Sequence, residues 1–233
     1  MKKEQVQQEL AEKGLKWVGE DYKNLQTPLK LVCDNNHEIF ECLKNIRKKS
    51  WKCPHCNDST SVQAIEKKGI RVLSLDNATH NCGWAIIENG KPISSGTHRV
   101  VASDTIQRIA EVKEWFTLLC KTYEVDVCGF ENVYYSGNPQ TLIVLSMLLG
   151  TLCVDAYERN YKLYCMSASE WRSIVGLRPA KRTTEAFKRA AQQEVRVRFG
   201  MNVSQDTAEA IMIGLAVEKK YKIESVQKAG FGY

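Results

Sequence analysis

The chain has 233 residues, of which 43% are hydrophobic, and its formal net charge is +6 at pH 7. This length suits one domain of moderate size plus a small module, and the sequence contains no repeat or low-complexity segment. We find no apolar run long enough to span a bilayer, and the N-terminus leads into a polar helix rather than a signal sequence, so we expect a cytosolic protein.

Nine cysteines are compatible with a reducing compartment. Because buried thiols act as small hydrophobic side chains, we assign that role to the cysteines in predicted apolar strands and helices. These are Cys120, Cys128, Cys153 and Cys165. The remaining clustered cysteines indicate a metal site rather than disulfides. The basic residues also occur in clusters, which suits binding to a polyanion, although many basic proteins bind none.

The N-terminal region predicts a short charged helix over residues 1–14, ending near Gly14, and then two short strands around a knuckle within 29–40. Two ligand pairs follow the spacing of a tetrahedral zinc site. One is Cys-x3-His and the other is Cys-x2-Cys, and their members are Cys33, His37, Cys53 and Cys56. A region this small cannot bury a core sufficient to fold alone, so one structural Zn²⁺ is expected to stabilise it.

His55 and Cys42 are the alternative zinc ligands in this region. Residues 44–52 lie between the two ligand pairs and form a basic stretch that contains Trp51. This stretch has two interpretations: a solvated loop beside the zinc site, or a patch that contacts phosphates with Trp51 as a stacking surface. Residues 58–68 are expected to form a linker or a short helix.

A buried strand begins at Ile70 and ends on the carboxylate of Asp76. Gly83 frees the backbone where a second apolar strand starts. The Asn-Gly pair within residues 88–91 predicts a hairpin turn, and a third strand follows over 92–101. We therefore predict a three-stranded antiparallel meander with Asp76 at the end of a central strand. A turn-forming Asp is the alternative interpretation of Asp76.

Apolar periodicity predicts an amphipathic helix over residues 105–123, followed by a buried strand over 125–130 that Glu131 closes. The apolar run 141–154 predicts a helix in which Gly150 allows close approach. Because this run is apolar on all sides, we expect one face against the sheet and another face against a dimer partner.

A fifth strand is predicted over residues 161–166, followed by a short helix with Trp171 and Ile174 and a basic helix over 182–198. The last predicted helix covers residues 205–216. Asp206 and Glu209 lie near the start of that helix and share one face, because they are three residues apart. The tail from about Glu224 is expected to be poorly ordered.

This order of elements predicts an α/β fold with a mixed sheet. Two predicted strands end on acids, and the last helix presents two more. Carboxylate oxygens are the ligands that Mg²⁺ and Mn²⁺ prefer, and two such ions about 4 Å apart can activate a water and stabilise the leaving oxygen of a phosphodiester. Taken singly, each acid is as well explained as a cap or a solvated side chain, and Asp206 suits a helix N-terminus.

Over about residues 70–220 the chain resembles the RuvC-type Holliday junction resolvases, which have an RNase H-like nuclease fold. The resembling motifs are Leu75-Asp76 followed by Gly83-Trp84-Ala85, then Phe130-Glu131-Asn132-Val133-Tyr134, then Asp206-Thr-Ala-Glu209-Ala210. The resemblance implies an RNase H-like mixed five-stranded sheet flanked by helices, with two Mg²⁺ or Mn²⁺ ions per active site. The implied catalytic and metal-binding residues are Asp76, Glu131, Asp206 and Glu209. Glu209 stands where the family usually has Asp.

The resemblance also implies contacts with DNA. Tyr134 or its neighbour Tyr135 matches the aromatic residue that enters the junction in this family and stacks on an unpaired base; an ordinary loop aromatic is the alternative. The basic residues implied to contact phosphates are Arg172, Lys181, Arg182 and Lys188. Such contacts position DNA and do not read its sequence, and a charged helix is otherwise only a solvated face.

The implied activity is that of a metal-dependent, structure-selective endodeoxyribonuclease: a homodimer that resolves four-way DNA junctions by paired symmetric nicks. Two alternatives stay open. One is a broader nuclease of the same fold that cuts branched DNA or RNA–DNA hybrids. The other is a non-catalytic zinc-ribbon DNA-binding protein. The Asp206/Glu209 pair argues against this alternative, because two adjacent carboxylates repel each other unless a cation is bound.

The sequence divides into predicted domains as follows: a zinc-ribbon-like module over 1–60, a linker over 61–69, the nuclease domain over 70–222 and a tail over 223–233. The zinc module resembles those appended to phage nucleases and departs from the bacterial enzymes, which lack it. We therefore expect a phage or mobile-element branch that acts in the bacterial cytoplasm or in a phage-infected host cell.

Overall fold

The computed structural model describes residues 3–19, 24–25, 28–34, 38–48, 51, 53, 66–134 and 137–230. The chain divides into two compact units, residues 1–65 and residues 66–233. Each unit has its own apolar core.

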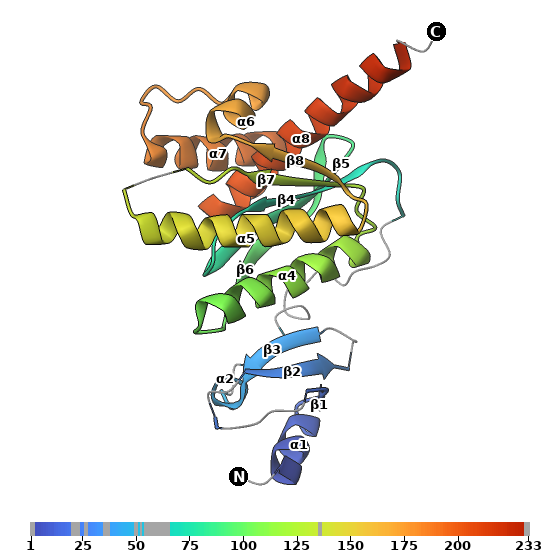
Figure 1. Cartoon of the computed structure of the whole chain (residues 1–233), viewed down its shortest axis with the longest axis vertical. Helices are drawn as coiled ribbons and strands as arrows, with labels where there is room; N and C mark the ends of the chain where they lie inside the picture. Colours follow the sequence, from blue (N-terminus) through green and yellow to red (C-terminus); the bar gives the residue numbers. More distant parts are fainter. Residues whose placement is uncertain are drawn as a thin grey trace. The chain divides into compact units, whose positions relative to one another are not determined.

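The first unit combines a helix with a small antiparallel sheet (Figure 1). Helix α1 spans Lys3–Ala11, and the sheet has the order β1 (Leu15–Trp17), β2 (Pro28–Cys33) and β3 (Glu38–Cys42), followed by α2 (Leu43–Ile46). The predicted helix and the two predicted strands are confirmed. Strand β1 was not predicted, because its three residues are too few to show a period.

The apolar cluster of the first unit includes two of the four predicted zinc ligands. Cys33, the last residue of β2, is buried in this cluster, and so is Cys53. Cys42, an alternative ligand, ends β3 and is also buried. The other predicted ligands, His37 and Cys56, lie outside the described residues, as do His55 and most of the predicted linker. The zinc-ribbon domain therefore stays a prediction.

The second unit is built on a five-stranded mixed sheet, as predicted, with the order β6-β5-β4-β7-β8. The strands are β4 (Arg71–Asp76), β5 (Asn81–Glu88), β6 (Lys91–Arg99), β7 (Val127–Glu131) and β8 (Lys162–Met166). The strands β4, β5 and β6 form the predicted antiparallel meander, whereas β7 pairs in parallel with both β4 and β8. Strand β4 is therefore the central strand, as predicted.

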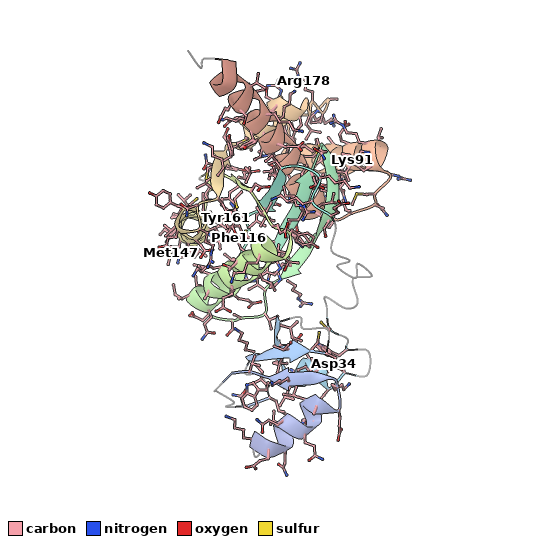
Figure 2. All side chains as sticks on the ribbon, turned by 90° about the vertical axis from the view of Figure 1, so that its right-hand side faces the viewer. Asp34, Lys91, Phe116, Met147, Tyr161 and Arg178 are labelled. Atoms are coloured by element: carbon pink, nitrogen blue, oxygen red, sulfur yellow. The ribbon has the colours of Figure 1, made fainter. Side chains whose placement is uncertain are left out.

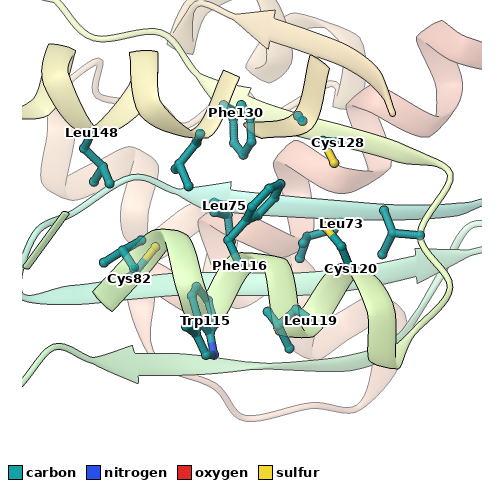
Figure 3. Packing of buried hydrophobic residues seen from close by; sticks show 14 of the residues in the cluster. Leu73, Leu75, Cys82, Trp115, Phe116, Leu119, Cys120, Cys128, Phe130 and Leu148 are labelled. Carbon is teal, nitrogen blue, oxygen red and sulfur yellow. The ribbon is translucent and has the colours of Figure 1, made fainter. Parts of the chain in front are cut away.

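Helices cover both faces of this sheet (Figure 1). One face carries α4 (Thr105–Thr122) and α5 (Pro139–Glu158); the other carries α6 (Ala168–Val175), α7 (Thr184–Phe199) and α8 (Gln205–Gly230). Figure 3 shows the first of the two cores, in which Leu73 and Leu75 of β4 meet Phe116 of α4. The second core holds the facing residues of the sheet and most of the apolar side chains of α8.

Helix α5 is apolar on its outer side as well as on its inner side. Leu148 and Leu152 are buried against the sheet, whereas 51% of Ile143 and 79% of Tyr157 are exposed. Met147, labelled in Figure 2, is also exposed. Our expectation that no segment could span a bilayer was wrong for this helix, since it is long and apolar enough to do so by length and composition alone. One such helix is weak support for a membrane span. Its Asp155 is instead part of the fold of the second unit, where it accepts hydrogen bonds from Thr117 and Arg159.

The close approach that we predicted at Gly150 of α5 does not occur within the subunit, and a close approach to a dimer partner stays a prediction. A Cβ atom at this position meets no atom of the described chain within 4 Å, so Gly150 serves no close approach within the subunit. Helix α8 instead lies close to the sheet through glycines. A Cβ at Gly129 would lie 2.5 Å from Val217, and one at Gly214 would lie 2.6 Å from the Ser74 hydroxyl.

The C-terminal helix is longer than predicted. The chain from about Glu224 was expected to be poorly ordered, but α8 continues without a break to Gly230. A tertiary contact contributes to this extension, because the Tyr164 hydroxyl donates a 2.7 Å hydrogen bond to Glu224 Oε2. The residues beyond Ala216 are polar enough to resemble a tail in sequence, and only the fold shows that they continue a docked helix.

Candidate active site

The alternation of side chains along the strands determines where the first two carboxylates point. On β4, Leu73 and Leu75 face one core, so Ser74 and Asp76 face α8 on the other side of the sheet. The same alternation holds on β7, where Phe130 faces the first core and Glu131 faces α6. The two strands are parallel with Leu75 opposite Phe130, so Asp76 and Glu131 come side by side at their carboxyl ends.

Two further carboxylates come from the first turn of α8. The Ser204 hydroxyl accepts a hydrogen bond from the backbone N–H of Thr207 and so caps this helix. The helix start lies against β5, because a Cβ at Gly83 would lie 2.2 Å from the carbonyl oxygen of Asp206. Gly83 is therefore needed for this close approach. The backbone freedom that we predicted for it is not what the structure uses, because Gly83 is not among the glycines with positive φ.

Three of the four predicted acids form one cluster. Asp76, Asp206 and Glu209 each offer a carboxylate oxygen, and these oxygens lie within 4.8 Å of one another. Glu131 is not part of this set, but its charge acts on Asp76. Among the residues that the structure describes, these three acids are the only such group of His, Cys, Asp and Glu side chains.

The electrostatics of the cluster favour a bound cation. Burial, together with the carboxylates of Glu209, Glu131 and Asp206, raises the pKa of Asp76 to about 8. Burial also raises the pKa of Glu131 and of Glu209, although nearby basic groups oppose the shift at both residues. A buried group of acids whose charges repel one another is stabilised by a cation with oxygen ligands, so the residues present fit Mg²⁺ or Mn²⁺.

Helix α6 supplies donors to two of the acids. The buried indole of Trp171 donates a 2.7 Å hydrogen bond from Nε1 to Glu131 Oε2. The guanidinium of Arg172 lies 3.5 Å from Glu209 Oε1 and packs over the rings of Trp171 and Phe187. Arg172, predicted to contact phosphate, is thus placed against a carboxylate of the site.

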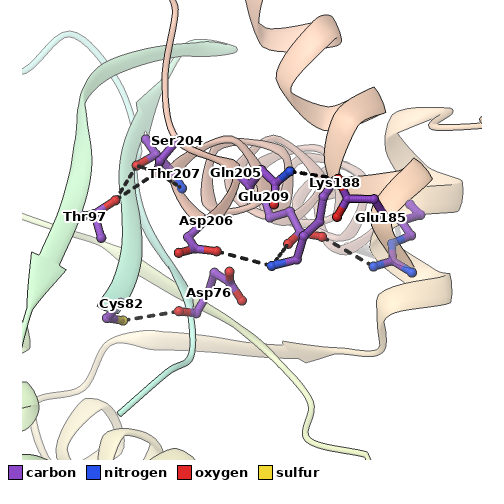
Figure 4. A network of polar contacts seen from close by, with 11 residues as sticks. Asp76, Cys82, Thr97, Glu185, Lys188, Ser204, Gln205, Asp206, Thr207 and Glu209 are labelled. Carbon is purple, nitrogen blue, oxygen red and sulfur yellow. Dashed lines mark hydrogen bonds and ion pairs between the residues drawn. The ribbon is translucent and has the colours of Figure 1, made fainter. Parts of the chain in front are cut away.

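Lys188 of α7 enters the same cluster (Figure 4). Its Nζ lies 3.3 Å from Asp206 Oδ1 and 3.5 Å from Glu209 Oε2. Burial alone would lower the pKa of this amine, but the carboxylates of Glu209, Asp206 and Asp76 outweigh that effect and raise it. Lys188 was predicted only as a contact of DNA.

The other predicted DNA contacts lie on the surface. Tyr134 is 61% exposed and follows Glu131 by three residues, whereas Tyr135 lies outside the described residues. Lys181 and Arg182 are exposed on the segment that leads into α7. These positions leave the three described side chains open to a large ligand, and their contact with DNA stays a prediction.

Trp171 is the member of the site that we did not predict from the sequence. The available signal was weak: a buried Trp needs a partner for its indole N–H, but the sequence does not show which partner. The fold supplies it, because β7 ends on Glu131 next to α6.

We expect Trp171→Phe to weaken binding of Mn²⁺ by about 10- to 100-fold, the usual effect of losing a hydrogen-bond partner of a metal ligand. Isothermal titration calorimetry with Mn²⁺ measures this. Trp115→Phe is the matched control, because Trp115 is also buried but lies in the other core, stacked on His98. Both variants should lose thermal stability, but only Trp171→Phe should lose metal affinity. Equal affinities in the two variants would contradict the positioning role.

Comparison with known proteins connects this site to one family. The family described as "Crossover junction endodeoxyribonuclease RuvC" matches residues 72–216, which is more than half of the chain. A protein of that name from Aliarcobacter butzleri is 33% identical over 101 residues, or 41% of this chain. One from Helicobacter hepaticus is 27% identical over 126 residues, which is 51% of this chain and 68% of that protein.

Solved structures show the same fold at low sequence identity. The structure of Thermus thermophilus RuvC has a TM-score of 0.55 and 13% identity, and it covers 66% of this chain and 97% of that chain. Its complex with a Holliday junction substrate has a TM-score of 0.53 and 11% identity, and the match covers 66% of this chain and 96% of that chain.

The sequence relatives are matched over only part of their length. The matched region spans 66% of the Aliarcobacter butzleri protein and 54% of a Campylobacter jejuni relative, which is less than two thirds of each.

Proposed function

Because the chain belongs to the RuvC family, we propose that it is a metal-dependent endodeoxyribonuclease that resolves four-way DNA junctions by paired symmetric nicks. The observation that carries this proposal is the cluster of Asp76, Asp206 and Glu209, whose oxygens lie within 4.8 Å of one another in the matched region. A binding module without catalysis would have no need for three adjacent buried or half-buried acids, which destabilise one another.

The residues of the chain would hold the metal and orient the phosphodiester. We propose that Asp76, Asp206 and Glu209 bind Mg²⁺ or Mn²⁺, with Glu131 completing a site for two ions. When bound, these metals supply Lewis acid catalysis of phosphodiester hydrolysis. Trp171 keeps the Glu131 carboxylate in one orientation through its indole N–H, and the buried surroundings of Asp76 exclude water from one side of the site.

The surface beside the site would bind the DNA. The exposed ring of Tyr134 follows Glu131 closely enough to stack on an unpaired base at the branch point, and Tyr135 is proposed as its alternative. Lys181 and Arg182 would contact phosphates, as would Arg172 and Lys188 if substrate draws them from their carboxylates. Phosphate contacts of this kind orient the DNA without reading its sequence.

Cleavage of a labelled immobile four-way junction tests the proposed activity. We expect paired symmetric nicks with Mg²⁺ and none with EDTA. Flap, three-way and RNA–DNA hybrid substrates are compared side by side, and equal cutting of these would replace junction resolution with a broader nuclease activity. Tight junction binding without cleavage in Mg²⁺ or Mn²⁺ would contradict catalysis altogether.

We also propose that the protein acts as a homodimer through the outer face of α5. Ile143, Met147 and Val154 are exposed on this helix, and apolar side chains in one patch favour association. Two symmetric sites would account for paired cuts. Sedimentation equilibrium of the full chain tests the assembly, and a monomer mass at the concentration that supports cleavage would contradict it.

For the first unit we propose a structural Zn²⁺ held by Cys33, His37, Cys53 and Cys56. Support comes from the burial of Cys33 and Cys53 in one cluster. We expect one zinc per chain by elemental analysis, and loss of that zinc in Cys53→Ser. Cys153→Ser, which removes a thiol of the second unit, should keep the full zinc content. Zinc retained by Cys53→Ser would contradict the assignment.

The proposed division of the chain is a zinc-ribbon-like module over 1–60, a linker over 61–69 and a nuclease domain that starts at residue 70. The separate tail predicted over 223–233 is not kept, because α8 continues to Gly230. We propose that the protein works in the cytoplasm of a bacterium or of a phage-infected host cell. Its assignment to a phage-type branch stays a prediction that rests on the zinc module.

A further inference from the structure

The cluster of acids already contains a cation of the protein itself. Lys188 Nζ lies 3.3 Å from Asp206 Oδ1 and 3.5 Å from Glu209 Oε2. Only 28% of the lysine side chain is exposed, and 6% of the Glu209 side chain. Lys188 reaches these carboxylates from α7, whereas both acids belong to α8, so the pairing also joins two helices.

These two carboxylates are also proposed metal ligands. A Mg²⁺ or Mn²⁺ ion bound to them would lie close to the ammonium group, and two cations that share the same oxygens repel each other strongly in a half-buried site. The ammonium must therefore either leave when metal binds or weaken the binding of that metal.

Among the residues that the structure describes, Lys188 has few other acceptors nearby. Glu131 already accepts the Trp171 indole, and the other basic group beside Glu209 is Arg172. On the α7 side, Glu185 is paired with Arg189. The partner that suits a displaced ammonium is an anion that arrives with the substrate, namely a phosphate of the DNA backbone.

We propose that Lys188 couples metal loading to DNA binding. Lys188 holds Asp206 and Glu209 until a DNA phosphate takes its ammonium, and both carboxylates then bind divalent metal more tightly. The inference rests on the proposed function, because it needs the acid cluster to be a metal site and the adjacent surface to bind DNA. Linkage makes the coupling reciprocal: DNA raises the affinity for metal, and metal raises the affinity for DNA by the same factor.

Lys188 is thereby a positioning residue whose effect differs in sign from that of a metal ligand. Removing a ligand weakens metal binding, whereas removing Lys188 strengthens it in the absence of DNA. A residue with only a structural role would leave the metal affinity unchanged. The change in metal affinity on substitution therefore distinguishes a metal ligand (weaker), Lys188 as proposed (tighter) and a structural residue (unchanged).

The test is calorimetric titration of the full chain with Mn²⁺ in the absence of DNA. We expect Lys188→Met to bind Mn²⁺ roughly tenfold more tightly than wild type, within the 5- to 150-fold range of typical couplings. Lys188→Arg should restore weak binding, because it keeps the charge. Lys121→Met is the matched control and should behave as wild type, since Lys121 is exposed in the last turn of α4 on the other face of the sheet. If Lys188→Met fails to fold, Lys188→Gln takes its place.

A second arm measures junction affinity by fluorescence anisotropy with and without Ca²⁺, which also prefers oxygen ligands. The gain in junction affinity from Ca²⁺ should be smaller in Lys188→Met than in wild type, and equal gains would overturn the coupling.

Asp76→Asn identifies which proposal fails. If its Mn²⁺ binding is lost while wild type and Lys188→Met bind equally, the coupling is wrong and the nuclease proposal stands. If no variant shows Mn²⁺ binding that depends on Asp76, both are overturned.

Discussion

Asp76→Asn is expected to abolish junction cleavage and, in EDTA, to raise the melting temperature of the protein. The loss of activity should exceed about 100-fold, because even the outer partners of metal ligands typically contribute 10- to 100-fold. The gain in stability follows from removing a carboxyl group whose ionisation is opposed by burial and by three neighbouring carboxylates. Parallel cleavage assays and thermal melts of the two proteins measure both effects.

The pH dependence of the stability difference gives a sharper test. The pKa of Asp76 is raised from 3.8 to about 8 in the folded protein, so between these values the folded state binds a proton that the unfolded state has lost. The contribution of this carboxyl to the free energy of unfolding is thus fully present below pH 4 and is lost as the pH rises to about 8. Asn does not titrate, so its advantage in EDTA should grow over this range and then level off. An advantage that is constant from pH 5 to pH 9 would contradict the shift.

Gly83→Ala is expected to displace the start of α8 and so damage the site without removing any ligand. The new Cβ would lie 2.2 Å from the carbonyl oxygen of Asp206 and 2.4 Å from its carbonyl carbon, and backbone atoms cannot move aside as a flexible side chain can. Such overpacking costs about 1–3 kcal/mol in unfolding free energy, and each kcal/mol lowers the melting temperature of a chain of this size by about 2–4 °C. Mn²⁺ affinity should fall together with stability, because Asp206 moves with the helix.

Gly150→Ala is the control for this substitution. Its Cβ meets nothing within 4 Å, and Gly150 lies inside α5, where Ala is favoured over Gly by about 0.5–1 kcal/mol. The control should therefore melt at the same temperature or slightly higher, with unchanged Mn²⁺ affinity. Because Gly150 is exposed on the helix proposed to form the dimer, the mass of this variant by sedimentation equilibrium should also match that of wild type. Full metal affinity in Gly83→Ala would show that α8 tolerates the shift and that the close approach is not needed for the site.

The order of strands and helices in the second unit could be predicted from the sequence, because each element carries a local signal. The run that ends on Asp76, the Asn-Gly turn before Lys91 and the apolar stripe of α4 each indicate their own structure. The approach of Asp76 to Glu131 was also accessible in outline, since both end buried strands. The parallel pairing of β4 with β7 then places them side by side.

The parts that could not be predicted depend on distances between elements. Nothing near Trp171 in the sequence identifies Glu131 as its acceptor, since 40 residues separate the two. Lys188 resembles the other lysines and arginines of a basic helix, and only the packing of α7 on α8 brings it to Asp206. Glycines at β5 and α8 carry no side chain whose pattern could indicate a partner, although their contacts determine how closely the helix approaches the sheet.

The position of α8 at the end of the fold has a consequence for how the site is formed in time. Strands β4 and β7 are synthesised first and carry Asp76 and Glu131, whereas Asp206 and Glu209 follow much later in the chain. A nascent chain therefore cannot assemble the acid cluster until α8 has been made and has docked on the sheet. Any later local opening that lifts α8 removes two carboxylates at once, so the opening that exposes this helix to solvent is also the event that would release the metal.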